Sequence, residues 1–172
     1  MLGESGVAAS LPDLPGCNES AAPLHEQNLA LWRQGAADAA LQLGCTHALG
    51  LRAAANILPD LPGWAYAPIS GKAALRGLLR ARVLTSKEAG LAEDRDTLLE
   101  KGRYDGLKLA GYNLGPAMIA EMSEADLPAS DRRSVIAQSE LGGGGLWLRA
   151  EPDHAPEQAE ALVARILSDL DR

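Results

Sequence analysis

The chain has 172 residues, of which 47% are apolar and 23% charged, a balance typical of one globular domain with its own apolar core. It contains 31 alanines and 29 leucines, but only 4 valines, 5 isoleucines and no phenylalanine. Because alanine and leucine favour helices and β-branched residues favour strands, this composition argues against a strand-rich fold or a large parallel sheet. The net charge of −7 argues against nucleic acid or an anionic membrane surface as a partner.

Elements are predicted from helical periodicity and from helix start and stop residues. The first 23 residues are rich in glycine, proline and serine, so we expect them to form a loop-rich arm. Most of the helices that follow begin at serine, threonine or proline and end at glycine or proline. The predicted helices cover residues 24–43, 46–58, 70–84, 86–101, 105–112, 116–124, 131–140 and 156–170.

The expected fold is therefore mainly α, a compact bundle of six to eight short helices. At most one small β-hairpin is expected, near residues 141–150, because residues 146–149 are the one strand-like stretch. We predict one domain, residues 1–172, made of the arm (1–23), a helical body (24–140), and a glycine-rich hinge with a C-terminal helix (141–172). The amphipathic C-terminal helix either packs back on the body or binds a protein partner.

The cysteines and histidines do not predict a metal site. Cys17 and Cys45 are too few for a disulfide framework, and we expect ordinary reduced thiols. With His25 and His47 they form the spacings Cys-x7-His and Cys-x-His, which match no zinc pattern. We therefore expect no metal and no cofactor.

Targeting signals are also absent from the sequence. The N-terminus lacks a basic segment followed by an apolar run, and no window reaches eighteen apolar residues. We expect no signal peptide and no membrane span, which makes the cytoplasm the default location.

One short block resembles a known family. Residues 107–116 read LKLAGYNLGP and resemble the Tyr-Asn-x-Gly-Pro block of lytic transglycosylases, the goose-type-lysozyme-like enzymes that cleave peptidoglycan. The resemblance implies that Tyr112 and Asn113 line a glycan cleft. The family's acid is a glutamate followed by serine, so the resemblance implies Glu4 as the general acid/base, with Glu26 and Glu88 as the alternatives.

The chemistry of that family explains what such residues would do. A glutamic acid of raised pKa protonates the glycosidic oxygen, and attack by the sugar's own hydroxyl replaces water, so one carboxyl can suffice. Trp64 and Tyr66, in a glycine-flanked loop, are candidates to stack on a sugar ring. The foremost functional hypothesis is therefore a peptidoglycan-cleaving protein that binds glycan.

Two alternatives remain open, as does the question whether the protein is an enzyme. The Tyr-Asn-x-Gly-Pro turn is equally typical of a plain junction between helices, which leaves a non-enzymatic helical interaction or adaptor module. A second pattern resembles SGNH esterases and implies Ser5 as nucleophile, His154 as base and Asn113 as an oxyanion donor. The blocks that carry it are Gly3-Glu4-Ser5, Gly111-Tyr112-Asn113 and Glu151-Pro152-Asp153-His154. That family needs a parallel sheet, which the composition disfavours.

Overall fold

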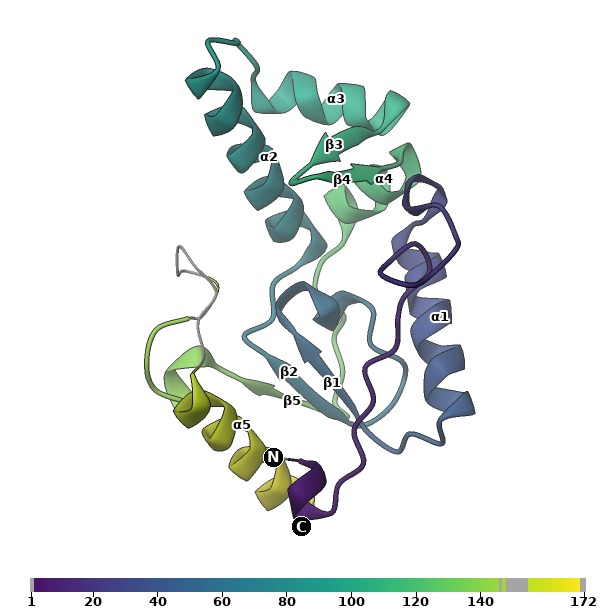
Figure 1. The fold of residues 1–172 in the computed structure, drawn as a ribbon, viewed down its shortest axis with the longest axis vertical. Helices are drawn as coiled ribbons and strands as arrows, with labels where there is room; N and C mark the ends of the chain where they lie inside the picture. Colours follow the sequence, from purple (N-terminus) through teal and green to yellow (C-terminus); the bar gives the residue numbers. More distant parts are fainter. Residues whose placement is uncertain (1, 146, 148–154, 171–172) are drawn as a thin grey trace.

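The computed structural model describes residues 2–145, 147 and 155–170, and its fold mixes helices and strands (Figure 1). The prediction of a mainly α bundle of six to eight short helices, with at most one small hairpin near residues 141–150, is wrong. A three-stranded parallel sheet and a two-stranded antiparallel sheet lie among the helices. The helices are α1 (Leu29–Gln42), α2 (Gly71–Glu88), α3 (Arg95–Asp105), α4 (Pro116–Glu124) and α5 (Pro156–Leu170). Short 3-10 helices are η1 (Gly3–Ser5), η2 (Leu24–Glu26), η3 (Arg52–Asn56) and η4 (Gln138–Glu140).

The first sheet is parallel and three-stranded, in the order β1-β2-β5. Its strands are β1 (Ala48–Leu51), β2 (Gly63–Tyr66) and β5 (Arg133–Ile136). Leu51, Tyr66 and Ile136 stand side by side in register at the carboxyl ends of the three strands. The second sheet is an antiparallel hairpin of β3 (Leu107–Leu109) and β4 (Tyr112–Leu114).

The helix starts follow from the sequence. The side chains of Asn28, Ser70 and Asp94 each accept a hydrogen bond from a backbone N–H in the first turn of α1, α2 and α3. Such caps satisfy amide groups that the helix itself leaves unbonded. α4 begins at Pro116, and it and α5 have the predicted bounds.

Two strands of the parallel sheet, β1 and β5, lie where helices were predicted, and tertiary pairing explains why. Residues 46–58 form β1 and η3, and residues 131–140 form β5 and η4. β1 reads ALGL and β2 reads GWAY, so glycine allows close approach where a β-branched residue would not fit. A Cβ at Gly63, whose φ is 148°, would overlap the carbonyl oxygen of Ala48. Four-residue strands need few valines and isoleucines, so the composition excluded only a large sheet.

The hairpin replaces the helix predicted for residues 105–112. Its two-residue turn is Ala110-Gly111, with φ of 49° and 87°, the positive values that a tight hairpin of this twist requires. The register pairs Leu109 with Tyr112 and Lys108 with Asn113. Tyr112 and Asn113 therefore lie on a strand and not at the end of a helix.

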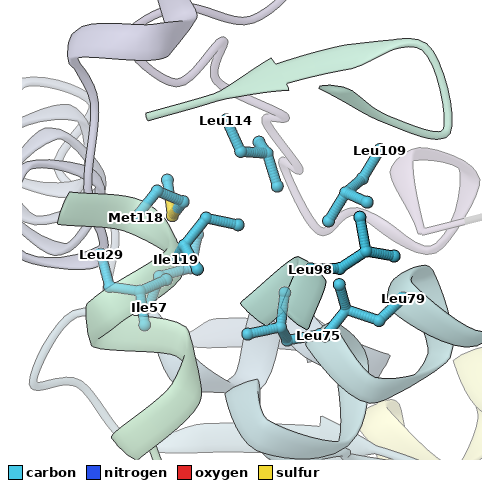
Figure 2. Close-up of a cluster of buried hydrophobic side chains, with 9 residues drawn as sticks. All are labelled: Leu29, Ile57, Leu75, Leu79, Leu98, Leu109, Leu114, Met118 and Ile119. Carbon is cyan, nitrogen blue, oxygen red and sulfur yellow. The ribbon is translucent and has the colours of Figure 1, made fainter. Parts of the chain in front are cut away.

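The side chains pack into two separate apolar clusters. The first joins α1, α2, α3, α4 and the hairpin; Figure 2 shows its members, Leu29, Ile57, Leu75, Leu79, Leu98, Leu109, Leu114, Met118 and Ile119. The second lies between the parallel sheet and α5, and its buried members are Trp64, Tyr66, Ile136 and Ile166. The apolar face of α5 thus packs on the body of the protein, which is one of the two alternatives that the sequence left open for this helix.

Asn56 stabilises the segment through which the chain passes from the parallel sheet to α2. Its side chain is 2% exposed, accepts a hydrogen bond from Gly71 N and donates to the carbonyl oxygens of Ala53 and Ile69. Arg33 of α1 donates to the Asn56 carbonyl oxygen. None of the described helices is both long and apolar enough to cross a membrane.

Candidate functional site

The carboxyl ends of the three parallel strands gather the polar and aromatic side chains of the candidate site. Arg52 directly follows β1, Ala67 directly follows β2, and Gln138 is the second residue after β5. In sheets of parallel strands, ligands bind outside the carboxyl ends, where loops from several strands meet. This edge of the sheet is therefore the first place to look for a ligand site.

Arg52 is held in this position by backbone geometry and by two contacts. Its φ is 55° and that of Ala67 is 42°, a left-handed conformation that costs free energy in residues other than glycine and is found at functional sites. Its Nη1 donates to the Ala67 carbonyl oxygen over 2.8 Å. Its guanidinium carbon lies 4.0 Å from the ring centroid of Trp147, a cation–π contact. Within the described ranges, no carboxylate lies at ion-pair distance from Arg52.

Tyr66 places a hydroxyl group beside this arginine. The residue is 7% exposed, its ring meets the edge of Trp147 at 6.0 Å between centroids, and its hydroxyl donates to Gln138 Oε1. Burial raises the pKa of Tyr66, while the charge of Arg52 and the hydrogen bond to Gln138 act in the opposite direction. The hydroxyl is therefore protonated at neutral pH and available as a hydrogen-bonding group.

A loop of four glycines, residues 142–145, closes one side of the site. Gln138 Nε2 donates to Gly142 O over 3.2 Å, and Gln158 Nε2 of α5 donates to Gly144 O over 2.8 Å. A Cβ at Gly145 would lie 2.7 Å from the Trp147 ring, so only glycine lets the loop approach the indole this closely. The loop thus ties Trp147 and Gln138 to the first turn of α5.

The donors of Arg52 define what this arrangement can bind. The guanidinium group carries five N–H groups in a planar fork, and among the described residues only Nη1 donates a hydrogen bond, to the Ala67 carbonyl oxygen. The edge formed by Nε and Nη2 is the one that binds a carboxylate through two parallel hydrogen bonds. Arg52 therefore carries the donor groups that a carboxylate requires, and Trp147 lies against its guanidinium group.

The residues of the peptidoglycan hypothesis lie far apart. η1, which contains Glu4, lies beside the end of α5, whereas the hairpin with Tyr112 and Asn113 lies toward the opposite end of the long axis (Figure 1). Glu4 is exposed, and its pKa is lowered by a hydrogen bond from the chain's amino group and by that group's charge. A general acid needs the opposite shift. The alternative acids Glu26 and Glu88 are exposed as well.

The two aromatic candidates differ in their surroundings. Trp64 is 6% exposed, donates from Nε1 to Asp169 Oδ2 of α5 and stacks on His47 at 5.5 Å between centroids. Its ring is part of the second apolar cluster, which makes it a packing residue in this conformation. Tyr66, by contrast, belongs to the site at the carboxyl ends of the strands.

The residues of the esterase hypothesis are not brought together among the described residues. Ser5 lies in η1, and Asn113 lies in the hairpin beside a different surface. His154, Glu151 and most of the strand-like stretch 146–149 lie outside the described residues, so the hairpin expected near 141–150 is not described either. Both cysteines are free thiols, and the described part of the chain holds no cluster of three metal-ligating side chains.

Sequence reasoning missed Arg52 and Gln138 as site residues. The available signal was positional, because each follows a short segment, ALGL or RSVI, that proved to be a parallel strand. Without the strand assignment, neither residue stands out from the other arginines and glutamines. Comparison with models of known protein families, with curated proteins and with solved structures finds no match to this chain.

Proposed function

We propose that this chain binds a small molecule bearing a carboxylate group at the carboxyl ends of β1, β2 and β5. The observation that carries the proposal is Arg52, a half-buried arginine in a strained conformation, stacked on Trp147 and without a carboxylate partner among the described residues. A half-buried cation is partly removed from water, and a ligand carboxylate supplies the counter-charge that it lacks among the described residues.

The neighbours of Arg52 suggest how the rest of a ligand is held. Trp147 is 39% exposed, so part of its ring is free to contact an apolar group of the ligand. The hydroxyl of Tyr66 and the amide of Gln138 offer hydrogen bonds beside the cation. Among the described residues of this site, none is a nucleophile with an activating base, and the proposal is limited to binding.

The test compares a carboxylate with its uncharged amide. Benzoate and benzamide have the same ring and nearly the same shape, and only benzoate offers two charged oxygens to Arg52. We expect benzoate to shift the amide resonances of Arg52, Ala67 and Gln138 in a titration of the 15N-labelled protein, and benzamide to leave them in place. The indole N–H resonance of Trp147, assigned with Trp147→Phe, reports on the ring itself.

Two substitutions of Arg52 separate charge from geometry. Arg52→Gln removes the cation, and Arg52→Lys keeps the charge but loses the planar fork, so we expect no binding in the first and about tenfold weaker binding in the second. Arg76→Gln on the exposed face of α2 is the matched control and should bind like the wild type. Equal responses to benzoate and benzamide, or binding that survives in Arg52→Gln, would rule the proposal out.

A further inference from the structure

A second site is suggested by a cavity of about 320 Å³ that lies between η2 and the β3–β4 hairpin, away from the parallel sheet. The residues that line it include the polar residues His25, Asp105, Lys108 and Asn113, together with two glycines, Gly106 and Gly115. Part of the Tyr-Asn-x-Gly-Pro block therefore lines a cavity, although on a strand and without a glutamate. The site at Arg52 does not account for these side chains.

The two glycines fix the walls of the cavity. A Cβ at Gly115 would overlap the carbonyl oxygen of His25, so η2 packs directly on the backbone at the start of α4. Gly106 has a φ of 76°, and a Cβ there would lie 2.6 Å from the carbonyl oxygen of Leu114. Backbone contacts this close leave little freedom to this part of the cavity wall.

Two charged residues, Asp105 and Lys108, lie at the rim of the cavity. Their charges do not stabilise the elements that carry them, α3 and the hairpin. Asp105 is the last residue of α3, where the partial negative charge of the helix end repels a carboxylate. Lys108 stands opposite Asn113 in the hairpin register. In the part of the chain that the structure describes, neither Asp105 nor Lys108 has an ion-pair partner. An acidic and a basic residue thus line one cavity without forming an ion pair with each other.

We propose that this cavity binds a small zwitterion, a molecule with a primary ammonium and a carboxylate. The carboxylate of Asp105 receives the ammonium group, and the ammonium of Lys108 with the amide of Asn113 receives the carboxylate. The first turn of α4 has no side-chain cap, and its partial positive charge adds to the side of the cavity that receives the carboxylate. A ligand with only one of the two charges leaves one rim charge without its partner.

The experiment uses three probes that differ by one charge each. The free amino acid glycine carries both groups, N-acetylglycine lacks the ammonium, and glycinamide lacks the carboxylate. We expect the free amino acid to shift the backbone amide resonances of Gly106, Asn113 and Gly115 in the 15N-labelled full chain. Each single-charge probe should bind about 1.5-fold to fivefold more weakly, the range expected for one charge pair close to solvent.

Substitutions at the rim test the assignment of each charge. Asp105→Asn should abolish the preference for the amino acid over N-acetylglycine, and Lys108→Gln should abolish the preference over glycinamide. Both side chains are exposed, so the fold should tolerate these changes. Glu100→Gln and Lys101→Gln, on the exposed face of α3 outside the cavity lining, are the matched controls.

Three results would overturn the inference. These are no shift at the cavity amides up to about 100 mM amino acid, equal binding of all three probes, and rim variants that behave like their controls. Arg52→Gln should leave these titrations unchanged, so the two sites are tested independently.

Discussion

At the scale of single residues, the buried side-chain amide of Asn56 fixes the path of the chain between the parallel sheet and α2. Its side chain satisfies three backbone groups of residues 53, 69 and 71, which would otherwise be buried without partners. No other side chain type of that size both donates twice and accepts. The position of α2 relative to the sheet therefore depends on this residue.

The prediction for Asn56 concerns stability. Asn56→Ala leaves a buried N–H and two carbonyl groups short of partners, so we expect the free energy of unfolding to fall by about 2–4 kcal/mol. Urea denaturation followed by circular dichroism measures the change. Asn113→Ala, at an exposed position of the hairpin, should change the same quantity by less than about 0.5 kcal/mol. If Asn56→Ala lowers the free energy of unfolding as little as the control does, the path of the chain between the sheet and α2 does not depend on this amide.

A second residue-scale prediction concerns pH. Arg82 donates two hydrogen bonds to Glu93, and Ser86 donates a third, and these lower the pKa of Glu93 from 4.5 to about 2. Because the folded-state pKa is lowered, the stabilisation is complete above the unfolded value of 4.5 and is lost as the pH falls through about 2.

Glu93→Gln should therefore have a lower melting temperature than wild type at pH 7. This difference in melting temperature should disappear as the pH is lowered. Thermal melts at several pH values between 7 and 2 measure it. Glu100→Gln, which removes a charge elsewhere in the same region, serves as the control. A difference between wild type and Glu93→Gln that stays constant down to pH 2 would contradict the assignment.

At the scale of elements, the hairpin shows a turn that its residues do not favour. The turn of β3 and β4 needs positive φ at both central residues, and Ala110 adopts it at a cost of about 1 kcal/mol. The sequence Asn-Gly is the preferred pair for this turn. The hairpin therefore forms because Leu109 and Leu114 are buried in the first apolar cluster, and not because of its turn.

Ala110→Asn should accordingly stabilise the protein by about 0.5–1 kcal/mol, because asparagine tolerates the left-handed conformation better than alanine. Ala110→Val should destabilise it, since a β-branched side chain fits this conformation poorly. Thermal unfolding of the two variants beside wild type checks both directions. Stabilities that rank in the reverse order would show that the turn has a different geometry in solution.

The elements also show what the sequence could predict. α4 and α5 were predicted with their bounds, and α2 was predicted four residues short at its end, because periodicity, caps and proline are local signals. β1 and β5 were missed because ALGL and RSVI have no strand signal of their own and become strands by pairing with β2. The Arg52 site was missed for the same reason, since its residues lie side by side only when those strands pair.

At the scale of the whole molecule, the side chains are divided between two apolar clusters, and the chain passes from one to the other several times, for example through residues 67–70 and 125–132. The proposed carboxylate site lies at the sheet, and the proposed zwitterion site lies at the hairpin (Figure 1). Neither site shares a side chain with the other, which makes two independent ligands the simplest outcome. A whole-chain property such as the net charge of −7 bears on neither, because both depend on a few local groups.

The parallel sheet has a consequence for the order in which the chain folds. β2 and β5 are neighbours in space, yet α2, α3, the hairpin and α4 all lie between them in the sequence. Synthesis proceeds from the N-terminus, so the buried residues of the first cluster, the last of which is Ile119, are made before Ile136 and Ile166. The first cluster can therefore assemble while Trp64 and Tyr66 still lack these two partners. During that interval the nascent chain exposes two large aromatic side chains that the finished fold buries.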